Sequence, residues 1–326
     1  MPFRWKLKSS SALQPPPPDN SGTLTGTALT QETGPAPCRC CGSLRTRSLG
    51  KLPNARLFAG AQLEHALPGG VLYRCLHCKF VFRHPIFSKS VYDQLYQSGN
   101  STTWEEENRL DQDLVRNALN TFVKQGSILD IGCGTGNLLQ PLTGKFAAHG
   151  IEINAEAAQL AASRGIRMIT GDLDAINNTS QTFDAVIACD VIEHFANPLD
   201  FVRSMLARTK PKGHVIISTG NADAWSWRLT GSRFWYCYLP EHISFVSPNW
   251  FRIQAPNLGV QVVQSIPFTY SPAFSLLNRE LRLALMALFR ISPTLYYRML
   301  PRIKRNNIPV GRGITRDHFL IVLQKN

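Results

Sequence analysis

From residue 127 onward, short apolar runs alternate with amphipathic ones, and this alternation constrains the fold more than any other feature of the chain. Each short run is apolar almost throughout, which is typical of strands buried on both faces of a parallel sheet. The runs expected to be strands are residues 127–132, 148–153, 167–172, 183–190, 213–219, 259–268 and 317–326. The predicted fold class is therefore α/β, a doubly wound, seven-stranded and mostly parallel sheet.

The rest of the chain divides by composition. Residues 1–36 are rich in Ser, Thr, Gly and Pro and predict a disordered leader. Residues 37–84 hold five of the eight cysteines and predict a small zinc-binding module. The remaining expected boundaries are a linker with lid helices at 85–126 and a main domain at 127–326 with insertions at 221–250 and 268–315.

The formal net charge of +13 indicates either an anionic partner or a basic surface without a specific ligand. The basic amino terminus lacks an apolar run, and no window approaches 18 uninterrupted apolar residues, so we expect a cytoplasmic protein. The basic, amphipathic segment 275–292 leaves two interpretations open. It is either a helix that covers the sheet or a peripheral contact with an anionic membrane, here the inner membrane surface.

Three glycines follow the first predicted strand in the stretch ILDIGCGTGN, residues 128–137. Ligands of doubly wound sheets bind at the carboxyl ends of the strands, where glycines let the backbone approach them closely. The spacing Gly132, Gly134, Gly136 is one residue shorter than a dinucleotide fingerprint, and Asp130 precedes it. A short helix is expected to follow at 136–142.

The run LDIGCGTG resembles motif I of class I S-adenosylmethionine-dependent methyltransferases, and the resemblance extends over about residues 105–220. It implies a Rossmann-like methyltransferase fold with S-adenosyl-L-methionine as cofactor. The implied cofactor-binding residues are Asp130 for the ammonium group, Gly132, Gly134 and Gly136 for the carboxylate and ribose, Glu152 for the ribose diol, Asp172 and Leu173 for adenine, and Asp190 after the fourth strand.

The pairs Cys38-x2-Cys41 and Cys75-x2-Cys78 predict a structural zinc site. Four thiolates leave no open coordination position, so this Zn2+ is not expected to be catalytic. Cys40 could replace Cys38 as a ligand but is ranked behind it because of the spacing.

We call each of these two cysteine pairs a knuckle. The two knuckles and the stretch SLGKLPNARLF between them are similar to the amino-terminal zinc domain of methyltransferases that modify nucleotide-linked sugars. The motif LPEHISF resembles the catalytic HEH-type motif of that family, with Glu241 and His242 matching. Leu239 and Pro240 depart from it, which disfavours C-methylation. The resemblance implies a small sugar- or glycan-related acceptor, linked to a nucleotide or a lipid.

Two histidines compete for the role of general base, because an imidazole titrates near neutral pH. His194 follows the fourth strand, and His242 lies in an aromatic-rich insertion next to Glu241. The aromatic residues of that insertion either wall an acceptor pocket or form core; they are Trp225, Trp227, Phe234, Trp235, Tyr236 and Tyr238.

These observations predict an S-adenosylmethionine-dependent methyltransferase that acts on a small molecule. Two other hypotheses are an RNA methyltransferase, which would use the basic surface and the zinc module, and a non-catalytic zinc scaffold that binds the cofactor. Nucleic acid is the less favoured partner, because the sequence lacks a basic stripe interleaved with aromatic residues. The oligomeric state and the acceptor atom stay open.

Overall fold

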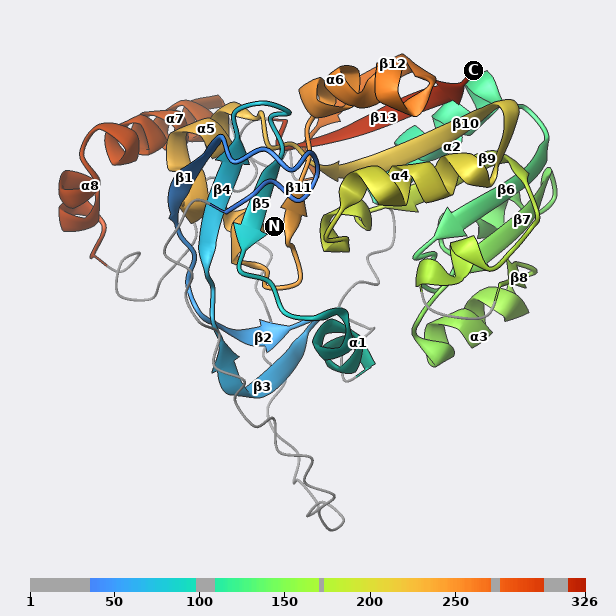
Figure 1. The fold of residues 1–326 in the computed structure, drawn as a ribbon, viewed down its shortest axis with the longest axis horizontal. Coiled ribbons are helices and arrows are strands. Elements are labelled where there is room, and N and C mark those ends of the chain that lie inside the picture. Colours follow the sequence, from blue (N-terminus) through green and yellow to red (C-terminus); the bar gives the residue numbers. More distant parts are fainter. Residues whose placement is uncertain (1–35, 98–108, 170–172, 271–275, 302–315) are drawn as a thin grey trace, which may run out of the picture. The chain divides into compact units, whose positions relative to one another are not determined.

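The computed structural model describes residues 36–97, 109–169, 173–270, 276–301 and 316–326. Within them, seven strands form one sheet in the order β12-β13-β10-β9-β6-β7-β8 (Figure 1). Their bounds are β6 Gly126–Ile131, β7 Phe146–Ile151, β8 Arg167–Met168, β9 Phe183–Cys189, β10 Thr209–Gly220, β12 Val260–Phe268 and β13 His318–Lys325. Only β13 runs antiparallel to its neighbours β10 and β12. The predicted seven-stranded, mostly parallel sheet is confirmed.

Alternating side chains of the central strands enter two separate cores, as the pleat of a strand requires. Leu129 of β6 packs with helices α4 (Pro198–Ala207) and α6 (Pro248–Leu258). The adjacent Ile128 packs with α2 (Leu110–Phe122) and α3 (Ala155–Ser163). Both faces of the sheet are therefore covered, which explains why its strands read as continuous apolar runs.

Two predicted elements are shorter than expected. The helix expected at 136–142 is a single 3-10 turn, η2 (Gln140–Leu142), in which Pro141 lacks the N–H that an α-helix interior needs. The strand expected at 167–172 is the two-residue β8, and residues 170–172 lie outside the described part of the chain.

The cysteine-rich segment forms a second sheet that a distant part of the chain completes. Its strands are β1 (Thr46–Lys51), β4 (Val71–Cys75), β5 (Val81–His84) and β11 (Ser244–Phe245), in the order β1-β4-β5-β11. Figure 1 shows β11, which follows β10 in the chain, at the edge beside β5. A hairpin of β2 (Ala55–Phe58) and β3 (Ala61–Leu67) packs against helix α1 (Lys89–Gln97), which follows β5. The cysteine segment and the insertion after β10 thus share one sheet.

Much of the aromatic insertion is core. It contains α5 (Trp225–Thr230), η5 (Gly231–Arg233) and η6 (Trp235–Tyr238). Trp227, Phe234 and Tyr236 are buried with residues of β4 and β5, whereas Trp225 is 68% exposed.

The second insertion folds into α7 (Leu276–Ile291) and α8 (Pro293–Met299). The elements that α7 contacts most are α8 and α5, rather than strands of the seven-stranded sheet. None of the helices in the described residues is sufficiently long and apolar to cross a membrane.

A buried arginine joins the cysteine segment to the insertion. Arg83 of β5 is 4% exposed, and its Nη2 donates to the carbonyl oxygens of Cys237 (2.9 Å) and Leu239 (3.1 Å). Its Nε donates to the His242 carbonyl at 3.2 Å, and its Nη1 to that of Gly69 at 2.7 Å. Burial lowers the pKa of Arg83. One guanidinium therefore satisfies three backbone carbonyls around the loop that carries Glu241 and His242, and a fourth in the loop before β4.

We predict that Arg83→Lys lowers the free energy of unfolding by about 3 kcal/mol, because a lysine ammonium cannot replace a fork of four buried hydrogen bonds. Urea denaturation followed by circular dichroism measures this difference. Arg45→Lys is the matched control, since Arg45 is exposed on the same segment and should change stability by less than about 0.5 kcal/mol. Equal destabilisation by the two variants would contradict the assigned role of Arg83.

Candidate functional site

The glycine turn after β6 combines a tight turn with open space. Gly134 has φ +53°, and a Cβ there would meet nothing within 4 Å. Gly136 has φ +84°, and a Cβ there would lie 2.2 Å from Cδ1 of Ile166. Gly136 is therefore required for packing, whereas the side of Gly134 is free for a ligand to approach the backbone.

Glu152, directly after β7, supports this turn with both carboxylate oxygens. Its Oε2 accepts from the N–H of Gly134 at 2.8 Å, and its Oε1 accepts from the N–H of Asn154 at 2.9 Å. Asn154 in turn caps α3, because its Oδ1 accepts from the N–H of Ala157 at 3.0 Å. Each oxygen of Glu152 retains a lone pair, so the carboxylate could still accept a diol.

Asp130 lies at the end of β6 and is 3% exposed. Its Oδ1 has no hydrogen-bond partner among the described residues. Burial, followed by the negative charges of Glu152 and Asp111, raises its pKa well above the usual value. A buried carboxylate oxygen without a partner is costly unless a ligand satisfies it. The ammonium group of S-adenosylmethionine has the required charge, so Asp130 and the Gly134 side of the turn fit this cofactor.

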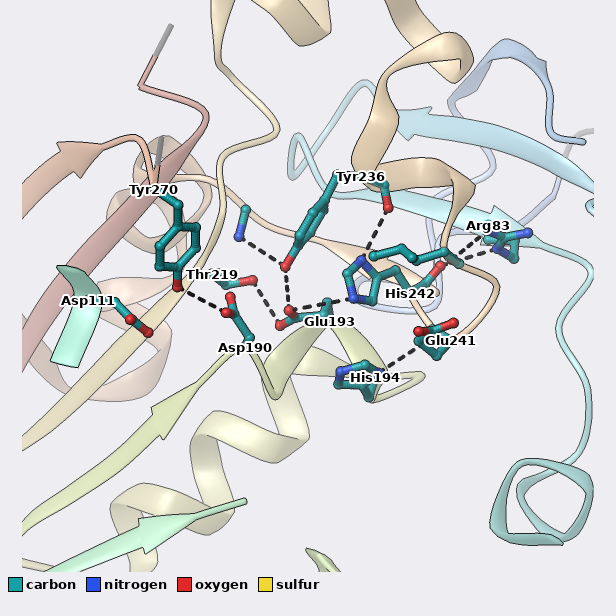
Figure 2. A network of polar contacts seen from close by, with 12 residues as sticks. Arg83, Asp111, Asp190, Glu193, His194, Thr219, Tyr236, Glu241, His242 and Tyr270 are labelled. Carbon is teal, nitrogen blue, oxygen red and sulfur yellow. Dashed lines mark hydrogen bonds and ion pairs between the residues drawn. The ribbon is translucent and has the colours of Figure 1, made fainter. Parts of the chain in front are cut away.

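Asp190 follows β9, and Figure 2 shows it beside Tyr270. It belongs to a charged cluster with Arg109, the residue that precedes α2. Its backbone has φ +54°, and its Oδ2 accepts from Nη2 of Arg109 at 2.5 Å and from Oη of Tyr270 at 3.0 Å. Arg109 also donates to both oxygens of the buried Asp111, at 3.0 and 2.6 Å. The sequence analysis missed Arg109, Asp111 and Tyr270, because nothing in their spacing relates them to Asp190.

The predicted adenine-binding pair cannot be placed. Asp172 lies outside the described residues. Leu173 begins the 3-10 helix η3 (Leu173–Asn177), and its side chain is not described.

The three predicted catalytic residues lie together, as Figure 2 shows. His194 ends the 3-10 helix η4 (Ile192–His194), and its ring centroid is 5.1 Å from that of His242. Its Nδ1 lies 3.1 Å from the carbonyl oxygen of Glu241 and 2.7 Å from Oη of Tyr96. Burial lowers the pKa of His194 below its usual value. The ring is therefore neutral at neutral pH and able to accept a proton.

His242 is more deeply buried than His194. Its Nδ1 lies 3.1 Å from the carbonyl oxygen of Tyr236. Because a carbonyl only accepts, Nδ1 carries the proton and Nε2 is the basic nitrogen, 4.0 Å from Oε1 of Glu193. Burial, followed by the charge of His194, lowers the pKa of His242 well below its usual value.

Glu193 is a buried acid directly before His194, and the sequence analysis assigned it no role. Its Oε1 accepts from the hydroxyl of Tyr236, and its Oε2 accepts from Oγ1 of Thr219 at 2.9 Å. Burial, followed by the charge of Asp190, raises the pKa of Glu193 to about 8. Residues from η4, β10 and η6 therefore form one polar network behind the two histidines (Figure 2).

Glu241 is 5% exposed, and its Oε2 has no hydrogen-bond partner within the described part of the chain. Burial raises its pKa, and the charges of His194 and Arg83 oppose this effect. Its carbonyl and its side chain both lie against the histidine pair.

The four predicted metal ligands also lie together. Sγ of Cys38 is 3.6 Å from Sγ of Cys78, and Sγ of Cys41 is 3.7 Å from Sγ of Cys75. All four sulfurs lie within 4.8 Å of one another, and Cys40 is not in this group. Zinc–sulfur bonds of about 2.3 Å in a tetrahedron place the sulfurs about 3.8 Å apart, so the cluster fits a four-thiolate zinc site.

Arg39, within the first knuckle, connects this cluster to the histidine loops. Its Nε donates to the carbonyl of Ala196 at 3.0 Å, two residues after His194. Its Nη2 donates to the carbonyl of Ile243 at 2.8 Å, and its Nη1 to that of Arg83 at 2.5 Å. The knuckle therefore contacts the backbone next to both histidines.

Comparison with known proteins connects this geometry to a family. The family model described as "Methyltransferase domain" matches residues 103–265, which are 163 of the 326 residues. The mitochondrial ubiquinone biosynthesis O-methyltransferase of Arabidopsis thaliana is 30% identical over 159 residues, 44% of this chain and 49% of that protein. The chain thus spans about half the length of this relative.

Two further similar proteins were found. The ubiquinone biosynthesis O-methyltransferase of Bartonella tribocorum is 27% identical over 166 residues, 47% of this chain and 67% of that protein. The crystal structure of a SAM-dependent methyltransferase from Archaeoglobus fulgidus has a TM-score of 0.43 and 16% identity, and the match covers 73% of this chain and all of that one. Because the family model matches half of the chain, the protein belongs to the methyltransferase-domain family.

Proposed function

We propose that this protein transfers a methyl group from S-adenosylmethionine to a hydroxyl group of a small molecule. The observation that carries the proposal is the carboxyl edge of the sheet, where the open Gly134 side, the unpartnered Asp130 oxygen and Glu152 lie on β6, β7 and their turns. When bound, the cofactor supplies an activated methyl group on a sulfonium ion. The protein's own tasks are to orient the reactants and to accept a proton.

Each residue of the edge has a distinct binding task. The backbone at Gly134 lies against the cofactor, and Glu152 holds the ribose diol while it fixes the turn. Asp130 accepts from the ammonium group, which neutralises a buried carboxylate. Asp190, held by Arg109, borders the same edge after β9.

The two glycines allow a matched test. Gly134→Ala would occupy the open side, so we predict that it weakens binding of S-adenosylhomocysteine at least about tenfold and lowers stability by about 1 kcal/mol, for strain at positive φ. Gly136→Ala should lower stability by about 3 kcal/mol, because its methyl group would overlap Ile166. Calorimetric titration and urea denaturation measure the two effects. Wild-type affinity in Gly134→Ala would refute the ligand position.

We assign His194 as the general base and His242 as the residue that positions it. His194 is the less buried of the two rings and follows β9, whose carboxyl end also carries Asp190. His242 is fixed by the Tyr236 carbonyl and packs against His194. Glu241 contacts His194 through its carbonyl.

The base assignment predicts a specific pH profile. Since the pKa of His194 is lowered, its neutral, active form should persist below the usual value of about 6.5, and kcat/KM should fall only at lower pH. His194→Ala should reduce kcat by about 10² to 10⁴ and abolish this acid limb. His65→Ala, an exposed histidine on β3, is the control and should retain wild-type kinetics. An unchanged rate in His194→Ala would remove the assignment.

The identity of the methyl acceptor is the more specific part of the proposal. The zinc-knuckle resemblance supports a hydroxyl of a nucleotide- or lipid-linked sugar, whereas the named relatives act in ubiquinone biosynthesis. A radiolabelled methyl-transfer screen should therefore contain both nucleotide sugars and phenolic ring precursors. Transfer to the phenolic set alone would exclude the sugar acceptor while leaving the methyltransferase proposal intact.

We further propose that Cys38, Cys41, Cys75 and Cys78 bind one structural Zn2+. The spacing of their sulfurs supports this, and the metal would stabilise the knuckle from which Arg39 reaches both histidine loops. Four thiolates would fill the coordination sphere of the metal and leave no open position for a substrate, so the site has no direct role in methyl transfer.

Elemental analysis of the full chain should find one zinc per protein. Cys75→Ser should lose the metal and several kcal/mol of stability, because a buried ligand is removed and metal binding contributes to folding free energy. Cys40→Ser is the matched control in the same knuckle and should retain full zinc content. Zinc loss in Cys40→Ser, with retention in Cys75→Ser, would overturn the ligand set.

A further inference from the structure

Helix α7 has apolar side chains on two opposite sides. Met286 and Phe289 are 1% and 8% exposed and face the protein. Leu281 and Ile291 are 57% and 82% exposed, and Ala284 is also exposed. At 3.6 residues per turn, positions 281, 284 and 291 fall within about 80° of one another. The solvent side of α7 therefore carries an apolar stripe over residues 281–291, next to the exposed Glu280 of the preceding turn.

Helix α8, which packs against α7, also exposes apolar side chains. Leu295 and Met299 are 45% and 58% exposed and are four residues apart, on one side of the helix. Tyr296 is buried, and its ring lies 5.2 Å from that of Phe289 on α7. The side chain of Ser292 caps α8 by accepting from the N–H of Leu295. The two helices are thus packed together, and we call their exposed apolar residues, Leu281, Ala284, Ile291, Leu295 and Met299, the α7–α8 face.

The charge of this pair is predominantly positive, because α7 and α8 together hold four arginines and one acidic residue, Glu280 near the start of α7. Residues 281–301 contain three arginines and no aspartate or glutamate. Arg290 and Arg298 are exposed at the ends of α7 and α8. Apolar stripes flanked by arginines are typical of helices that lie in the interface of an anionic bilayer.

We propose that the α7–α8 face docks on an anionic phospholipid membrane surface. Its apolar side chains enter the acyl boundary, and Arg290 and Arg298 contact lipid phosphates. A twofold contact between two copies would place like-charged arginines against each other. A nucleic acid would leave the apolar side chains without a partner. The membrane accounts for both features, and the inference does not depend on methyl transfer.

Sedimentation with vesicles tests the proposal on the full chain. We expect binding to vesicles of phosphatidylcholine with 30% phosphatidylglycerol at low salt, and little binding to phosphatidylcholine alone. The double variant Ile291→Ser/Leu295→Ser should weaken partitioning at least about tenfold, because it removes exposed apolar area. Arg290→Gln/Arg298→Gln should weaken it by about tenfold or more on anionic vesicles.

Leu44→Ser is the matched control, since Leu44 is 68% exposed but lies in the cysteine segment, and it should bind as the wild type does. Thermal unfolding confirms that each variant is folded. The proposal is overturned if the wild type fails to bind anionic vesicles or if both double variants bind unchanged. A self-association in sedimentation velocity that Ile291→Ser/Leu295→Ser abolishes would assign the face to a second copy instead.

Discussion

The arrangement of the site depends on one buried guanidinium. Arg83 extends from the cysteine-bearing sheet into the insertion and satisfies carbonyls around the His242 loop. A buried charge is tolerated only when its donors are satisfied, so Arg83 and these carbonyls require each other. Arg39 adds a second contact, from the knuckle to the backbone beside His194 and His242. The small sheet thereby holds the backbone of the loops that carry His194 and His242.

The large sheet supplies the other half of the site. Parallel strands place their carboxyl ends at one edge, so Asp130, Glu152 and Asp190 converge there although they are far apart in the chain. His194 lies near the same edge because η4 follows β9, and His242 of the insertion packs against it. Behind it, Glu193 is held by Tyr236 and Thr219, which keeps a buried acid satisfied next to two neutral imidazoles.

The local sequence pattern was sufficient to predict those features that depend on residues close together in the chain. The strands were predicted because burial on both faces makes them apolar, and the placement of the cysteines followed from a spacing that one metal ion requires. The contact of Glu193 with Tyr236 could not be predicted, because it joins residues 43 positions apart on separate elements. The role of the aromatic residues in the insertion could not be predicted either, because aromatic side chains are found both in pocket walls and in protein cores. Only the packing of Trp227 and Phe234 against β4 and β5 distinguished them.

If the carboxyl edge holds a nucleoside by its ribose diol, affinity must depend on the carboxylate charge of Glu152. Calorimetric titration of the full chain with S-adenosylhomocysteine, in the wild type and in Glu152→Gln, measures this directly. The amide replaces one of the two acceptor oxygens with an NH2 donor and removes the charge, so we predict measurable heat in the wild type and at least about a tenfold loss of affinity in the variant. No heat in a folded wild type, or equal affinity in both proteins, would contradict it.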